Sequence, residues 1–237
     1  MLLVVLLVTA WAAGLQSAGP APDAGSTDAI RLGPAAGEDV AAYLARTATV
    51  PDPADASPRL ALVQFDEALA PAAAATAVAG TTPLQAVVRV PVPRVQTALH
   101  RVDLPPAAPD AAFRAALTAA GQEVVPDASG ATTGDAGRDR RVLVARSELA
   151  ALGRPDCACV VAAVVRVDPA ALPAVRATAG VRAVDVAPPG TSRARLAVSP
   201  LLPDQGPGRP DGPVVGPVPD DGPLLGPFAV PGAPPGG

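Results

Sequence analysis

Residues 157–188, CACVVAAVVRVDPAALPAVRATAGVRAVDVAP, contain the pattern that decides the fold. The segment 157–167 is apolar at both odd and even positions, which is typical of a central strand buried on both faces. The Asp-Pro pair at 168–169 can begin a helix, and Gly180 can end it. The segment 181–188 then predicts a second strand. The whole stretch therefore predicts a strand–helix–strand unit.

An earlier stretch repeats this order. The apolar segment 59–65 predicts a strand, and 70–80 predicts a helix with Pro71 at its first position and Gly80 at its end. The segment 83–93 predicts a strand that its prolines push toward a sheet edge. Two such units in one sheet predict an α+β fold of the ferredoxin-like split βαβ plait, with four antiparallel strands and two helices on one face.

A long insertion, 94–156, separates the two units. We expect it to be helical, with helices over 109–121 and 139–153. A further short amphipathic helix is predicted over 40–47. Because a bare plait leaves one sheet face open, the strand at 157–167 needs a cover on its second face. The inserted helices, the helix at 40–47 or a partner could supply it.

The flanks differ in composition from this domain, which we place at 37–190. Residues 1–18 are apolar and predict a signal peptide or membrane anchor, and 19–36 predict a flexible linker. Residues 191–237 predict a disordered Pro/Gly-rich tail, within which DGPVVGPVPD and DGPLLGPFAV form a ten-residue repeat at 211–230. The expected location is the cell membrane, with the domain outside, or the extracellular space.

Charge and motifs exclude several classes of protein. The formal net charge is -4, and no arginine cluster is interleaved with aromatic residues, so nucleic acid is not an expected partner. The sequence has no nucleophile elbow, phosphate-binding glycine loop, HExxH or zinc-ligand spacing. His100 is the sole histidine, and Asp103 is the nearest carboxylate that could orient it. We therefore expect a protein that is not an enzyme and has no cofactor.

Cys157 and Cys159 share one face of the predicted strand. The leading interpretation is a pair of buried thiols, because a disulfide between alternate residues of an extended strand is near or beyond its usual reach. A thiol-redox site, a soft-metal site for an ion such as Cu(I), and a bond to another chain stay open as alternatives.

LALVQFDEALAPAAAATAVAG, from residue 60, and VVAAVVRVDPAALPAVRATAGVRAVDVAP, from residue 160, resemble the two halves of the propeptide/inhibitor domain of subtilisin-like proteases. The resemblance implies that the segment after the last strand, Val186 to Pro189, occupies a protease cleft. The whole chain is also similar to membrane-anchored proteins of high-GC Gram-positive bacteria. The positions that match the propeptide family are Leu60 to Phe65, Leu172, Val175, Gly180, Val181 and Val184.

From these observations we expect a non-catalytic extracytoplasmic domain, exported or membrane-tethered, that binds a protein or peptide. The sheet face or an edge strand is the expected binding surface, with Val184, Val186 and Pro188 as candidate contacts. One alternative is a propeptide-like protease inhibitor or folding helper. Another is a thiol-redox or soft-metal site at Cys157 and Cys159. Membrane contact is expected through the N-terminal apolar segment alone.

Overall fold

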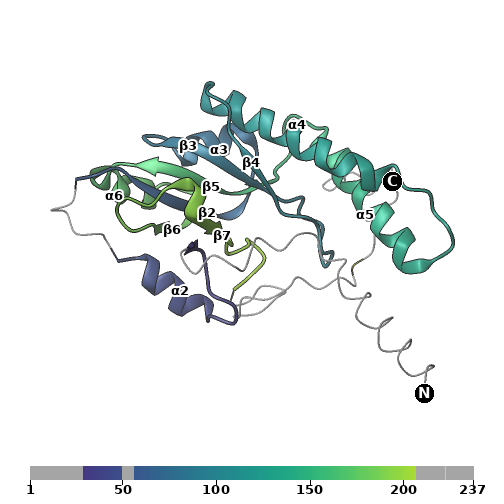
Figure 1. Cartoon of the computed structure of the whole chain (residues 1–237), viewed down its shortest axis with the longest axis horizontal. Helices are drawn as coiled ribbons and strands as arrows, with labels where there is room; N and C mark the ends of the chain where they lie inside the picture. Colours follow the sequence, from purple (N-terminus) through teal and green to yellow (C-terminus); the bar gives the residue numbers. More distant parts are fainter. Residues whose placement is uncertain (1–28, 50–55, 207–221, 223–237) are drawn as a thin grey trace, which may run out of the picture.

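A computed structural model of the protein describes residues 29–49, 56–206 and 222. They form an α+β fold around a five-stranded antiparallel sheet (Figure 1). Its strand order is β4-β3-β5-β2-β6. The strands are β2 (Arg59–Leu69), β3 (Thr82–Val88), β4 (His100–Asp103), β5 (Val160–Val167) and β6 (Val181–Val186).

The strand β5 lies at the centre of the sheet, as its apolar pattern predicts. It pairs with β2 on one side and with β3 on the other, so that Ala163 lies opposite both Val63 and Ala86. Ala163 and its neighbour Val164 are both buried, and they belong to different apolar clusters because successive side chains point to opposite faces of the sheet. Both faces of this strand are therefore covered.

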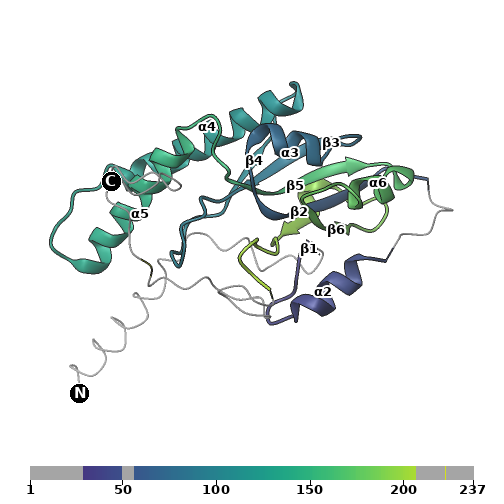
Figure 2. The ribbon, with the colours of Figure 1, turned by 180° about the vertical axis from the view of Figure 1, so that it is seen from behind.

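Helices cover the first face of the sheet (Figures 1 and 2). The helices α3 (Pro71–Ala77), α4 (Pro109–Ala128) and α6 (Leu172–Arg176) share one apolar core with this face. A short 3-10 turn at Pro169–Ala171 leads into α6. The helix α5 (Ala136–Leu152) packs against α4.

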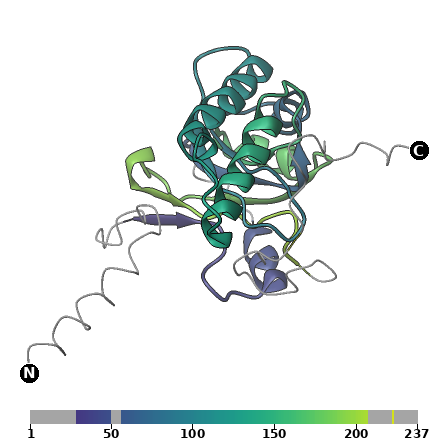
Figure 3. The same cartoon turned by 90° about the vertical axis from the view of Figure 1, so that its right-hand side faces the viewer.

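The second face is covered by α2 (Val40–Thr47) and by a parallel pair of short strands, β1 (Ile30–Leu32) and β7 (Leu196–Val198). A second apolar cluster joins Leu32 and Val198 to the sheet residues Leu62 and Val164. In the side view, the purple helix α2 and the teal helices α4 and α5 lie on opposite sides of the sheet (Figure 3). Of the covers considered from the sequence, α2 lies on this face and the inserted helices do not.

The insertion departs from the sequence prediction because it contributes a strand. β4 pairs with β3 and becomes the outer strand, so β3 lies inside the sheet and its predicted edge position is wrong. β3 tolerates this position because it ends at Val88, before Pro91 and Pro93. Pro83 lies where the register with β5 shifts.

Gly121 does not end α4, as the sequence predicts. The helix continues to Ala128, because Gly121 is buried where α4 meets α5. A Cβ at Gly121 would lie 3.7 Å from the Cβ of Leu152, so a small residue suits the close contact of the two helices. Pro126 lies in the final turn of the helix, which ends two residues later.

Folded elements extend beyond 37–190 at both ends. β1 lies within the predicted linker, 19–36, and β7 lies within the predicted tail, 191–237. Each has three residues, too few for an alternating pattern to be recognised. The predicted signal peptide or anchor at 1–18 lies outside the described residues. Within the described part of the chain, no helix is long and apolar enough to cross a membrane.

Candidate functional site

A groove of about 180 Å³ lies beside β6, which is one of the two outer strands of the sheet. Leu44 and Thr47 line it from α2, and Arg176 lines it from the end of α6. Arg182 and Val184 of β6 line it as well. Among the described residues that line this groove there are two arginines and no carboxylate, so it favours a negatively charged occupant.

Arg176 reaches across the groove from α6 toward the end of α2. Its Nη2 donates hydrogen bonds to the carbonyl oxygens of Thr47, Thr49 and Val184, at 3.0, 3.1 and 3.5 Å. Its Nε and Nη1 atoms are buried and have no hydrogen-bond partner. Burial lowers the pKa of the Arg176 guanidinium below its usual value. The side chain therefore carries a charge with unused donors, which costs free energy until a ligand satisfies them.

The outer edge of β6 offers backbone groups beside this arginine. The N–H of Ala187 donates to the Leu60 carbonyl at 2.8 Å, so the backbone of Ala187 faces β2. Because backbone groups alternate in direction along an antiparallel strand, those of Val184 and Val186 face away from β2. The bond from Arg176 to the Val184 carbonyl agrees with this direction. An added strand could pair at these two residues.

The three contacts predicted from the sequence lie at or near this edge but differ in exposure. The Val184 side chain is 1% exposed and belongs to the core, so only its backbone can contact a partner. Val186 is half-buried, and Pro188 is exposed. At Pro188 the chain turns, with the Thr191 N–H donating to the Pro188 carbonyl at 3.3 Å. The turn at 189–190 therefore ends the segment Val186 to Pro189 that the propeptide resemblance places in a protease cleft, where the family has an extended chain.

Behind the groove, a buried polar network holds α2 against the sheet. Asp185 of β6 accepts hydrogen bonds from the Gly33 N–H at 2.8 Å and from the Tyr43 hydroxyl at 3.5 Å. The amide of Gln64 donates to the Tyr43 hydroxyl, and its Oε1 accepts from the Leu201 N–H at 2.6 Å. Burial raises the pKa values of Asp185 and Tyr43. This network fixes one wall of the groove.

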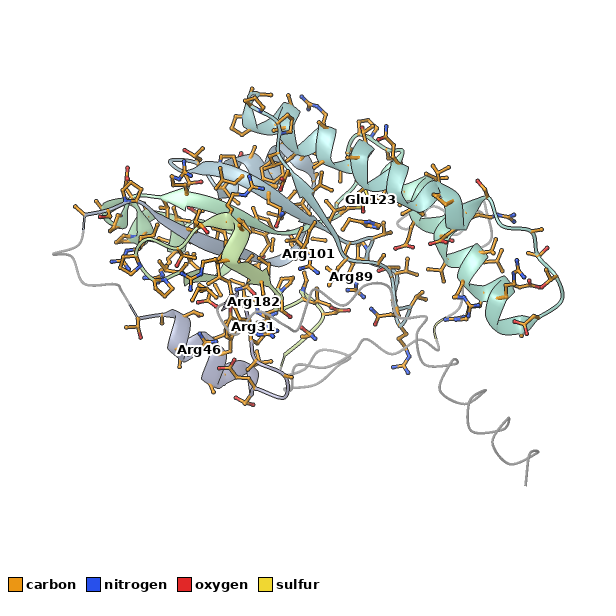
Figure 4. The ribbon with its side chains drawn as sticks, viewed as in Figure 1. Arg31, Arg46, Arg89, Arg101, Glu123 and Arg182 are labelled. Carbon is orange, nitrogen blue, oxygen red and sulfur yellow. A yellow bond between two sulfur atoms is a disulfide. The ribbon has the colours of Figure 1, made fainter. Side chains whose placement is uncertain are left out.

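Arginines surround this network on the α2 side of the sheet, where Figure 4 labels Arg31, Arg46 and Arg182. The Arg46 guanidinium lies 5.0 Å from the centre of the Tyr43 ring, and its Nη1 is 3.8 Å from Asp185. Arg182 donates to the Leu202 carbonyl at 2.9 Å. Arg46 and Arg182 fasten chain segments to one another, as Nη2 of Arg176 does, whereas Nε and Nη1 of Arg176 have no partner.

Cys157 and Cys159 form a disulfide, which corrects the expectation of free thiols. Their predicted burial is confirmed at 8% and 0% exposure. The pair precedes β5 rather than lying in it, and the Cys159 N–H donates to the Cys157 carbonyl at 2.9 Å in a tight turn. The turn brings the two Cα atoms to 5.3 Å, within the usual range for a disulfide. Over the described residues, no group of metal-ligating side chains is present.

His100 does not pair with Asp103. Its Nδ1 lies 2.8 Å from the carboxylate of Glu123 on α4, which Figure 4 shows extending toward β4. Asp103 instead accepts hydrogen bonds from Arg193 and from Gln85. The pairing of Glu123 with His100 could not be predicted from the sequence, because the two residues are 23 positions apart along the chain. Glu123 also lies on a helix whose sequence pattern indicates only packing.

The chain matches no family model, no curated protein and no solved structure. Among the sites in the described part of the chain, the groove beside β6 combines an open backbone edge with unused cationic donors. The sequence gives no indication that Arg176 has unused donors beside this edge, because Arg176 is an ordinary polar residue at the end of a helix.

Proposed function

We propose that the protein is a non-catalytic domain that binds an extended peptide segment along the outer edge of β6. The observation that carries this proposal is the buried, unpartnered Nε and Nη1 of Arg176 beside that edge. The groove of about 180 Å³ is smaller than a typical small-molecule site of about 300–1,000 Å³. It suits a single side chain of a bound strand better than a cofactor.

The chemistry of the groove favours a peptide with an acidic residue. Main-chain hydrogen bonds to Val184 and Val186 would supply affinity that does not depend on sequence. A carboxylate in the groove would accept hydrogen bonds from the unused donors of Arg176, and such charge-assisted bonds are the stronger class. The selectivity of the domain among peptides would then come from the acidic side chain that occupies the groove.

We infer that the scaffold is a ferredoxin-like plait. The order β3-β5-β2-β6, in which each βαβ unit places its helix on the same face, supports this inference. On this reading β4, α4 and α5 are additions carried by the insertion 94–156. The plait would make β6 a rigid outer strand, supported on one face by α6 and on the other by α2.

We further propose that the domain acts outside the cytoplasm, exported or tethered through residues 1–18. The Cys157–Cys159 disulfide supports this location, because disulfides persist in oxidising compartments. Membrane contact would be made by that N-terminal segment. A net charge of -4 does not favour nucleic acid as a partner.

The two alternatives have less support. A propeptide-like inhibitor would need an extended segment at Val186 to Pro189, but the chain turns at Pro188. A thiol-redox or soft-metal role would need accessible sulfur, but Cys157 is 8% exposed and Cys159 is fully buried. Inhibition of a subtilisin-like protease by micromolar protein would restore the inhibitor hypothesis.

The test is a selection of random peptides on the purified full chain, followed by affinity measurements with the selected peptides. We expect enrichment of peptides with an acidic residue next to β-branched residues. Arg176→Gln should weaken their binding at least about tenfold, because a hydrogen bond to a charged group contributes about 1.5–3 kcal/mol. Arg31→Gln, at an exposed position of β1, is the matched control and should bind as the wild type does.

Each variant's melting temperature must be compared with that of the wild type, because Arg176 also joins α6 to the end of α2. Folded Arg176→Gln protein that binds the selected peptides at wild-type affinity would contradict the proposal. Failure to select any acidic peptide would do so as well.

A further inference from the structure

Gly222 is seated against residues far from it in the sequence. Its N–H donates to the Arg94 carbonyl at 2.6 Å, and its own carbonyl accepts from Arg140 Nη2 at 3.1 Å. Gly222 is buried. Pro93 and Arg94 lie in the connection between β3 and β4, and Arg140 lies on α5. A tail residue is thus held by two elements of the folded domain.

The seat accepts only glycine. A Cβ on Gly222 would lie 2.3 Å from the Pro93 carbonyl oxygen and 2.7 Å from that of Arg94. Both are backbone atoms, so a flexible side chain cannot move aside to relieve the overlap. Any larger residue would have to leave the seat or distort the turn beneath it.

The turn that forms the seat is itself unusual. Arg94 has φ 55°, and among the described residues it is the one non-glycine residue with positive φ. The Val95 N–H donates to the Val92 carbonyl at 3.2 Å and closes the turn around it. Backbone held in a sparsely populated conformation often marks a ligand-binding position. The seated glycine supplies a hydrogen bond to this residue's carbonyl.

The tripeptide that contains the seated glycine occurs twice in the sequence of the tail. Asp-Gly-Pro occurs at 211–213 and again at 221–223, at the start of each ten-residue repeat. Gly222 belongs to the second copy, and Gly212 has the equivalent position in the first. The chain therefore carries both a glycine-selective seat and repeated segments of the type that it holds.

We propose that Pro93, Arg94 and Arg140 form a binding site for the glycine of Asp-Gly-Pro segments, and that Gly222 of the same chain is its resident occupant. The site is distinct from the groove beside β6 and goes beyond the peptide binding proposed there. A tethered ligand is present at high effective concentration, so an external segment must compete with it. Gly222 thereby competes with an external segment for the site.

The test uses the full chain and a fluorescent synthetic peptide with the sequence of residues 218–228. Gly222→Ala should empty the seat and raise peptide affinity at least about tenfold over the wild type, because the tethered competitor is lost. Gly212→Ala makes the same change at the equivalent repeat position and should leave peptide affinity at the wild-type level. A peptide with alanine in place of its first glycine should not bind.

A second variant tests the seat from the receptor side. In the Gly222→Ala background, Arg140→Gln removes the donor to the glycine carbonyl and should weaken peptide binding several-fold, with the circular dichroism spectrum unchanged. Equal peptide affinity for the wild type and both glycine variants would overturn the proposal. So would equal binding of the alanine peptide, or no peptide binding to Gly222→Ala at millimolar concentration.

Discussion

Gly33 allows the segment that carries β1 to pack closely against Ser199 and the sheet. It has φ 110°, and a Cβ there would lie 1.7 Å from the Ser199 carbonyl oxygen, while its N–H donates to buried Asp185. Gly33→Ala should lower the free energy of unfolding by about 2–4 kcal/mol, since it adds backbone strain to steric overlap. Gly37→Ala is the control, because Gly37 also has positive φ, 74°, but has open space around it. Urea denaturation should show a clearly smaller loss for the control.

Glu148 is a buried carboxyl whose charge opposes folding. It is 4% exposed, and burial raises its pKa despite the hydrogen bond from the Ala98 N–H and the attraction of His100 and Arg89. The folded state therefore binds the proton more tightly than the unfolded state, so this group's contribution to stability falls as pH rises above about 4.5.

Glu148→Gln keeps an acceptor for Ala98 and removes this titration. The free energy of unfolding of the variant relative to the wild type should therefore increase as pH rises from 4 toward neutrality. Urea denaturation at several pH values measures this difference. A difference that stays flat, or that decreases with pH, would contradict the burial argument.

At the scale of elements, α6 is a short helix that depends on its packing. It has five residues, too few to be stable alone, and buries Leu172 completely in the core beneath the sheet. Leu172→Ala should cost about 2–5 kcal/mol of stability and loosen the wall that carries Arg176. Leu99→Ala, at a position 40% exposed, should change stability by less than about 0.5 kcal/mol. Thermal denaturation of both variants compares them directly.

Elements with a clear period could be predicted, and those without one could not. β2 and β5 follow apolar runs, and α3 and β6 follow their Pro-to-Gly and post-glycine positions, so all four agree with the sequence prediction to within a few residues. β1, β4 and β7 have three or four residues each and gain their stability from pairing with distant strands. The roles of Arg176 and Arg140 depend on contacts with carbonyl groups elsewhere, and side-chain type does not encode these.

At the scale of the whole molecule, the sheet separates two layers that are held to it by different interactions. The layer of α3, α4 and α6 contains the larger apolar core, whereas the layer of α2, β1 and β7 combines smaller apolar clusters with a few buried polar bonds around Asp185 and Gln64. The helix α6, which carries Arg176 of the groove, and the helix α5, which carries Arg140 of the glycine seat, lie toward opposite ends of the molecule (Figure 1). Occupation of one site therefore need not block the other.

The parallel pairing of β1 and β7 also has a mechanical consequence. Ile30 lies beside Leu196 and Leu32 beside Val198, and the Ser199 N–H extends the ladder by a bond to the Leu32 carbonyl at 2.9 Å. Tension applied to the chain before residue 30 and after residue 199 would pull the two strands past each other along their length. Hydrogen bonds loaded in this shearing direction share the force and must yield together. The pair would thus act as a clamp that protects the sheet when the two ends of the domain are pulled apart.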